Sequence, residues 1–186
     1  MKILVTGSSG FIGYHLAREL LKKNNQVIGI DNNNNYYSNV IKKNRLKKLK
    51  KYKNFFFHEL NIINQKKLAT IFKKHKPSIV IHLAGQPGVL YSLKNPGIYL
   101  TNNVKATESI CKTSKMYNVK KFIFGSSSSV YGDQKIFPIK EKFKTNPKNP
   151  YAKTKLKAEK IVITKFKNSL TKYLIFRFFT VYGPFG

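Results

Sequence analysis

The fold is decided by the stretch Thr6-Gly7-Ser8-Ser9-Gly10-Phe11-Ile12-Gly13, which lies between the first apolar run of the chain and a predicted helix. Its first glycine permits a tight turn, its second lets the backbone approach a pyrophosphate, and its third allows the helix to pack closely on a sheet. The phosphates would lie at the N-terminus of that helix, where free N–H groups and the helix dipole favour an anion. Three glycines alone are a weak indication, but their place between a strand and a helix predicts a dinucleotide site. The residues predicted to bind the cofactor here are Gly7, Gly10, Phe11, Ile12 and Gly13.

Short β-branched or aromatic runs alternate with longer amphipathic stretches along the chain. Strands that are apolar throughout, with helices between them, indicate a parallel sheet covered on both faces, and right-handed crossovers make it doubly wound. We therefore predict an α/β fold, with residues 1–186 forming one NAD-binding Rossmann domain. The predicted strands are residues 3–6, 26–30, 55–59, 78–83, 121–125 and 172–178, and the predicted helices are residues 11–23, 42–53, 65–75, 98–117 and 150–166.

Asp31 ends the second predicted strand about 20 residues beyond the glycines, where a carboxylate would accept hydrogen bonds from both adenosine ribose hydroxyls. It would repel a 2′-phosphate, and no arginine follows it, so the predicted cofactor is NAD rather than NADP. The alternative is an Asp that merely starts a turn. Asn61 and Ile62 follow the third strand, where the adenine edge would lie, although an ordinary loop Asn explains that position nearly as well.

Asn149 and Pro150 are the predicted N-cap and first position of a helix. Tyr151 and Lys155 are four residues apart on this helix and so project from the same face. A free tyrosine has a pKa near ~10, and we expect the ammonium and a positively charged nicotinamide to lower it, so that the phenol can act as a base. Such a pair is common by chance. The fifth strand, however, ends in the run Ser126–Ser129, and hydroxyls at the carboxyl end of a parallel strand face the crevice where ligands bind. A serine run in an ordinary turn is the alternative.

The formal net charge of +29 has two explanations. A polycation could bind nucleic acid or an anionic membrane; alternatively, a genome of low GC content fills tolerant surface positions with lysine. The lysines are scattered over nearly every predicted helix, and the densest run, residues 42–53, keeps Ile41, Leu46, Leu49 and Tyr52 at roughly the spacing of an amphipathic surface helix. We favour residue bias and predict no nucleic-acid and no membrane partner.

The single cysteine, Cys111, leaves no internal disulfide to form, which suits a reducing cytoplasm. No apolar run approaches the ~20 residues that a membrane span needs, and the apolar start is too short for a signal peptide. We therefore predict a cytoplasmic protein, and we expect no metal site.

Several further motifs occur in the order and spacing of one family. The sequence contains TGSSGFIG, an acidic residue at the end of the second strand, HLAGQPGV, SSSSVYG, YAKTK and RFFTVYGP. Together they cover essentially the whole chain, which resembles the extended short-chain dehydrogenase/reductases of the NAD-dependent epimerase/dehydratase type. The segments Asp31–Tyr37 and Tyr91–Pro96 make it most similar to UDP-glucuronate 4-epimerases.

The resemblance implies a site and a reaction. Ser127 would be the catalytic hydroxyl, Tyr151 the base, and Lys155 its partner, which also binds the nicotinamide ribose. The base would take the proton of the sugar 4-hydroxyl while the C4 hydride passes to NAD, and the hydride would then return to the other face of the 4-keto sugar. The nicotinamide side would be lined by Leu83, Ala84, Gly85 and Gln86, and the sugar of a UDP-sugar substrate would lie near Gln86, Ser127, Ser128, Ser129, Tyr151 and Thr180.

Related enzymes provide alternatives. Related 4,6-dehydratases carry Asp-Glu directly after the catalytic hydroxyl, and related decarboxylases carry a Glu two residues after it; here these positions are Ser128 and Ser129, which favours an epimerase. Leu90 stands where UDP-glucuronate epimerases usually have an arginine, and Gly85 and Pro87 replace alanines. The substrate is therefore left as UDP-glucuronate or a UDP-glucose/galactose type.

The resemblance also indicates that the chain is the N-terminal part of a longer epimerase, without most of its substrate domain. We therefore expect it to bind NAD but to turn over little UDP-sugar, and an inactive NAD-binding module and a basic nucleic-acid binder remain as alternatives. Helices of this family often pair, which suggests a homodimer of the full-length enzyme.

Overall fold

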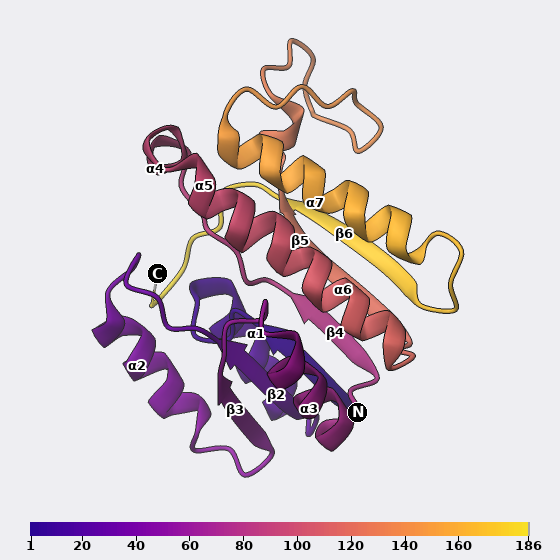
Figure 1. Cartoon of the computed structure of the whole chain (residues 1–186). Helices are drawn as coiled ribbons and strands as arrows, with labels where there is room; N and C mark the ends of the chain where they lie inside the picture. The colour runs from indigo at the N-terminus through magenta and orange to yellow at the C-terminus, as the bar shows by residue number, and fades with distance from the viewer. Residues whose placement is uncertain (186) are drawn as a thin grey trace.

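The computed structural model describes residues 1–185, which form a six-stranded sheet with helices on both faces (Figure 1). All neighbouring strands are parallel, in the spatial order β3-β2-β1-β4-β5-β6. The chain winds outward from β1 in both directions, so the predicted doubly wound, Rossmann-like fold is confirmed. The strands are β1 (Lys2–Thr6), β2 (Gln26–Asp31), β3 (Phe55–Glu59), β4 (Ile79–His82), β5 (Lys121–Ser127) and β6 (Lys172–Phe178).

Two layers of helices cover the sheet. α1 (Phe11–Lys22) and α2 (Asn39–Leu49) lie on one face, and α3 (Gln65–His75), α6 (Ala106–Met116) and α7 (Pro150–Phe166) lie on the other. Each layer of helices packs on its own cluster of buried side chains. The four inner strands contribute to both clusters, because the side chains of successive residues point to opposite faces of the sheet. The bounds predicted for α3, α7 and β6 are confirmed at both ends.

The single helix predicted for residues 98–117 is replaced by several segments. α5 (Pro96–Tyr99) leads into the π-helical η1 (Leu100–Lys105), and α6 follows without a break. The short α4 (Val89–Lys94) and the 3₁₀ turn η2 (Ser128–Tyr131) are not among the predicted elements.

The expected apolar face of the basic segment is confirmed for Leu46, Leu49 and Tyr52, which pack in or against the core, but is wrong for Ile41. α2 ends at Leu49, Ile41 is 42% exposed, and Lys42 and Arg45 are buried beside Leu49. The two cations face inward because they find backbone carbonyl partners there: Lys42 donates to Asn34 and Arg45 to Ser9. Hydrogen-bonded partners of this kind offset the cost of burying a charge.

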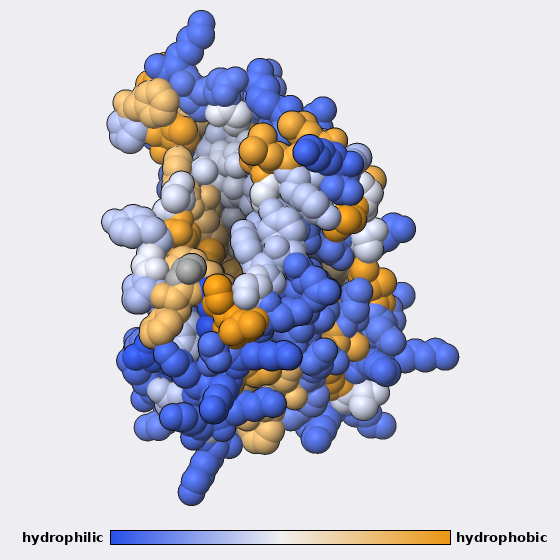
Figure 2. Space-filling view, turned by 90° about the vertical axis from the view of Figure 1, so that its left-hand side faces the viewer, coloured by the Kyte–Doolittle hydropathy of each residue, from blue (hydrophilic) through white to orange (hydrophobic). Residues whose placement is uncertain are grey.

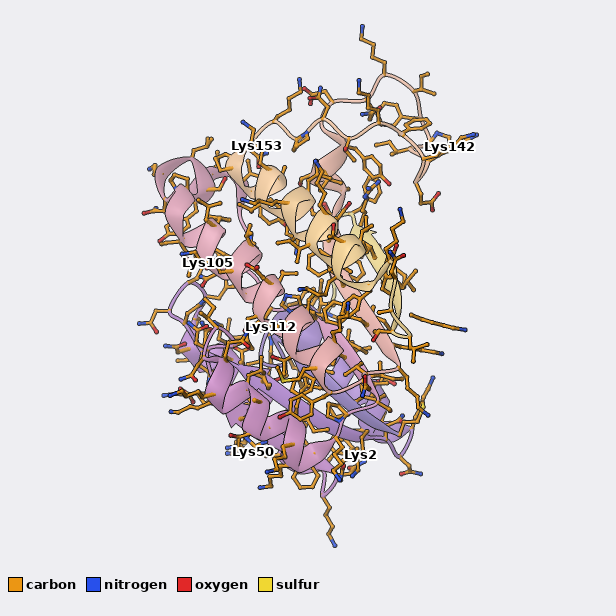
Figure 3. All side chains as sticks on the ribbon, turned by 45° about the vertical axis from the view of Figure 1, so that its right-hand side comes forward. Lys2, Lys50, Lys105, Lys112, Lys142 and Lys153 are labelled. Carbon is orange, nitrogen blue, oxygen red and sulfur yellow. The ribbon has the colours of Figure 1, made fainter. Side chains whose placement is uncertain are left out.

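The other lysines are scattered, as predicted. Figure 3 shows lysines of strand, helix and loop segments spread from the top to the bottom of the molecule; it labels Lys2, Lys50, Lys105, Lys112, Lys142 and Lys153. Among residues 1–185, none of the helices combines the length and the apolar character needed to cross a bilayer.

Candidate active site

A cavity of about 870 Å³ opens at the carboxyl ends of the strands. Figure 2, taken from the side toward which the strands point, shows the surface hollowed there. Every residue predicted to contact the cofactor lines this cavity: Gly7, Gly10, Phe11, Ile12, Gly13, Asp31, Asn61, Ile62, Leu83, Ala84, Gly85, Gln86, Tyr151 and Lys155. The fold thus brings residues from most of the chain to one place, while their individual roles remain predictions.

The glycine turn is built so tightly that side chains would not fit. Gly7 has φ +73°, and its N–H donates to the carbonyl of Ile30 at 2.7 Å. A Cβ on Gly13 would lie 2.0 Å from the Gly7 carbonyl oxygen. Gly10 precedes the first turn of α1, and that turn contains no acidic residue, so this helix end is suited to an anion.

Asp31 is held in place by the backbone. One carboxylate oxygen accepts from the Ser9 N–H at 3.0 Å and the other from the Asn33 N–H at 2.9 Å, and the residue is only 8% exposed. Asn61 also bonds locally, since its side-chain oxygen accepts from the Ile63 N–H at 3.1 Å. Asn61 thus forms the local hydrogen bond of an ordinary loop Asn, and its contact with adenine stays a prediction.

Ser127, Tyr151 and Lys155 converge on one wall of the cavity. Ser127 is the last residue of β5, and the two other residues lie on the first turns of α7, whose N-cap Asn149 accepts from the N–H of Ala152 at 2.8 Å. This is the N-cap predicted by the sequence. Helix capping thus fixes where α7 begins, and with it the position of Tyr151.

The pKa of Tyr151 is shifted by its surroundings, and the lowering expected from Lys155 together with a bound nicotinamide stays a prediction. Burial raises the pKa of Tyr151, and the hydroxyl of Ser127 is the group that opposes this rise. The Nζ of Lys155 donates to the carbonyl of Gly125 at 2.5 Å. Burial lowers the pKa of Lys155 itself to about 8, against the attraction of Glu159.

Three residues predicted near the sugar lie outside the cavity lining. Ser127 donates to the Ser129 hydroxyl at 3.1 Å and accepts from the Ser129 N–H at 3.2 Å, so the serine run forms a turn of its own. Ser128 belongs to the same turn, η2, and Thr180 is exposed. Their contacts with a substrate remain predictions.

Sequence reasoning missed several lining residues. Tyr36, Tyr37, Lys42 and Arg45 line the cavity from the segment between β2 and β3. The Tyr-Tyr pair was visible as part of a motif, whereas nothing distinguished these two cations from the many surface lysines around them. Asn103 was also missed; it holds the wall at Gln86 by hydrogen bonds that join residues far apart in the sequence.

Comparison with known proteins places the chain in a family. The model of the NAD dependent epimerase/dehydratase family matches residues 3–186. The chain belongs to this family. Two curated relatives in the epimerase/dehydratase family are the UDP-glucuronate 4-epimerase of Thermodesulfobacterium geofontis, 41% identical over 184 residues, and the dTDP-D-glucose 4,6-dehydratase of Dictyostelium discoideum, 38% identical over 196 residues.

The solved structures agree with this placement. The UDP-glucuronic acid 4-epimerase of Bacillus cereus, in complex with UDP-glucuronic acid and NAD, is 37% identical and superposes with a TM-score of 0.93. The match covers 99% of this chain and 58% of that one. The match to the Thermodesulfobacterium relative covers 98% of this chain and 57% of that protein. The match to the Dictyostelium relative covers 98% of this chain and 44% of that protein.

Proposed function

We propose that this chain forms the cofactor-binding and catalytic part of an NAD-dependent UDP-sugar 4-epimerase. The observation that carries the proposal is that Ser127, Tyr151 and Lys155 line the same cavity as the glycine turn and Asp31. A dinucleotide lying across this cavity would reach from Asp31 to the phenol. The names of its relatives favour UDP-glucuronate or another UDP-sugar as the substrate.

The residues present fit NAD. A Cβ on Gly10 would meet only the Gly7 carbonyl oxygen within 4 Å, so the N-terminus of α1 is open to phosphates, and the buried carboxylate of Asp31 suits two ribose hydroxyls. When bound, NAD supplies a hydride acceptor that returns the hydride to the sugar.

The protein side chains would move and hold the proton. Tyr151 would accept the proton of the sugar 4-hydroxyl, with the Ser127 hydroxyl as its hydrogen-bond partner. Because burial raises the pKa of Tyr151, the phenol is protonated at neutral pH, and the phenolate depends on nearby positive charge. Lys155 is the buried cation on the same helix face that can provide it.

The two residues after Ser127 favour epimerisation over related reactions. A dehydration needs a separate acid and base to eliminate water, and Ser128 and Ser129 offer neither. The similarity to a dTDP-D-glucose 4,6-dehydratase makes a dehydratase the alternative function.

The experiment is to incubate the protein with NAD and either UDP-glucuronate or UDP-glucose over long times, because little turnover is expected, and to identify the products by NMR. A 4-epimer supports the proposal, a 4-keto-6-deoxy sugar indicates a dehydratase, and a pentose with CO₂ indicates a decarboxylase. NADH binding without any turnover supports the alternative of an inactive NAD-binding module. Tyr151→Phe should abolish any turnover, whereas Tyr173→Phe, on the exposed edge strand β6, should not.

A further inference from the structure

α7 carries Tyr151, Lys155 and Glu159 at intervals of four residues, and therefore on one face. Two of them bond to successive residues at the end of β5. Lys155 Nζ donates to the carbonyl of Gly125 at 2.5 Å, and the Ser126 hydroxyl donates to Glu159 Oε1 at 2.5 Å. The next residue of β5 carries the hydroxyl that faces Tyr151. These two hydrogen bonds therefore set the register between the helix and the strand that together build the reactive wall.

Glu159 is a buried carboxylate with several donors. It is 2% exposed, and Arg177 donates to it twice, from Nε at 3.0 Å and from Nη2 at 2.8 Å. The guanidinium carbon of Arg177 lies 4.7 Å from the ring centroid of Tyr131, and its Nη1 donates to the carbonyl of Glu141 at 3.2 Å. A planar guanidinium held on three sides keeps the carboxylate in one geometry. Glu159 thus joins α7 to β5 and β6.

The groups that face Lys155 identify Glu159 as its counter-charge. Tyr151 and Glu159 lie on the same helix, and His82 faces the ammonium from β4. Burial lowers the pKa of His82 to about 3, so this imidazole is neutral at physiological pH. Arg177, on β6, lies behind Glu159. Among the residues that the structure describes, Glu159 is the carboxylate that opposes the lowering of the Lys155 pKa.

We propose that Glu159 is a positioning residue, which keeps the Lys155 ammonium charged and in register with the end of β5. The chemical purpose of that charge rests on the proposed function, since an epimerase needs Lys155 as a cation beside Tyr151. The electrostatic relationship itself does not depend on a cofactor or a substrate.

The test is a titration of the lysine side chains by NMR in protein with isotope-labelled lysine. The Lys155 signal is assigned by its loss in Lys155→Arg. It should titrate near pH 8 in the unmodified chain, well below the surface lysines. In Glu159→Gln the midpoint should fall by roughly half a unit to one unit, because the counter-charge is lost. In Arg177→Met it should rise, because Glu159 is then no longer shared.

The matched control is Glu19→Gln, which removes an exposed carboxylate paired with Lys22 and should leave the Lys155 midpoint unchanged. If Glu159→Gln does not fold, the double variant Glu159→Gln/Arg177→Met is measured instead. This double variant also removes Arg177, the cation that Glu159→Gln alone would leave without its carboxylate, and a smaller lowering of the Lys155 midpoint is expected because a repelling positive charge is lost as well. A folded variant lacking Glu159 in which Lys155 titrates as in the unmodified chain overturns the proposal. A purely structural role would weaken folding without moving that midpoint.

A second measurement connects the inference to the site. The affinity for NADH, followed by its fluorescence, should weaken as Lys155 loses its proton, and in Glu159→Gln this decline should begin at a lower pH. A chain that binds no NADH would refute the proposed function but leave the lysine titration intact. If Glu159→Gln leaves the Lys155 midpoint unchanged and NADH still binds normally, the role of Glu159 is refuted and the proposed function is not.

Discussion

The side chain of Asn103 pairs with both backbone groups of Gln86, accepting from its N–H at 2.6 Å and donating to its C=O at 3.1 Å. Asn103 also donates to the Thr154 hydroxyl at 3.1 Å, and Thr154 donates to the carbonyl of Tyr151 at 2.8 Å. The loop that follows β4 is therefore attached to the helix that carries the phenol. One buried amide in η1 couples the two walls of the cavity.

Asn103→Ala should loosen this loop. The change removes three hydrogen bonds worth about 1 kcal/mol each and leaves buried backbone groups of Gln86 without partners. We expect a lower free energy of unfolding, by roughly 2–3 kcal/mol, and weaker NADH binding. Thermal unfolding and NADH fluorescence measure both effects. Asn168→Ala, in an exposed turn, is the control and should change neither.

Gly13→Ala should damage both the fold and the cofactor site. Its Cβ would lie 2.0 Å from the Gly7 carbonyl oxygen, so the turn or α1 must move. We expect a loss of several kcal/mol in the free energy of unfolding, of the order seen for overpacking, and no measurable NADH binding. Gly97→Ala is the matched control, because a Cβ there meets nothing within 4 Å. In the helix α5 it should be neutral or stabilise by up to about 1 kcal/mol. Equal behaviour of the two variants would contradict the close packing of the turn.

Asp31→Asn should change the choice between the two nicotinamide dinucleotides. The carboxylate would repel a 2′-phosphate, and the buried cations Lys42 and Arg45 line the same cavity. Removing the negative charge should weaken NADH binding by about tenfold or more and raise the affinity for NADPH relative to NADH. Paired titrations with the two cofactors test this, with Asp133→Asn on an exposed loop as the control. An unchanged ratio of the two affinities would argue against Asp31 as the ribose ligand.

Lys155 should make stability rise with pH. Burial lowers its pKa from the ordinary 10.5 to about 8, so above pH 8 the folded protein has released a proton that the unfolded chain still holds. The destabilisation by the buried charge is present below pH 8 and is relieved toward pH 10.5, with a limit of roughly 3 kcal/mol. Denaturant unfolding at pH 7.5 and 9.5 should show this gain in the unmodified protein and in Lys153→Met, an exposed lysine of the same helix. It should be absent in Lys155→Met.

The scattered lysines predict weak, non-specific binding to nucleic acid. Retention on DNA at about 50 mM salt should be lost by about 200 mM and should show no sequence preference, because released counterions drive such binding. A gel-shift series over salt concentration and DNA sequence is the measurement. Tight, sequence-dependent binding at physiological salt would point to a nucleic-acid function instead.

The sequence by itself determined the fold class, a doubly wound parallel sheet, together with the glycine turn and the helix that carries Tyr151 and Lys155. Each of these follows from a local pattern: the period of apolar residues, three glycines between a strand and a helix, and a capped helix with two residues four apart. Such patterns need no knowledge of which distant segments meet.

Only the tertiary structure decided which way buried polar groups turn. The inward position of Lys42 and Arg45, the raised pKa of Tyr151 and the bond between Ser126 and Glu159 all depend on partners from other elements. Burial and a partner's position set both the cost of a charge and the direction of a pKa shift, and these are properties of the packed molecule rather than of any one segment.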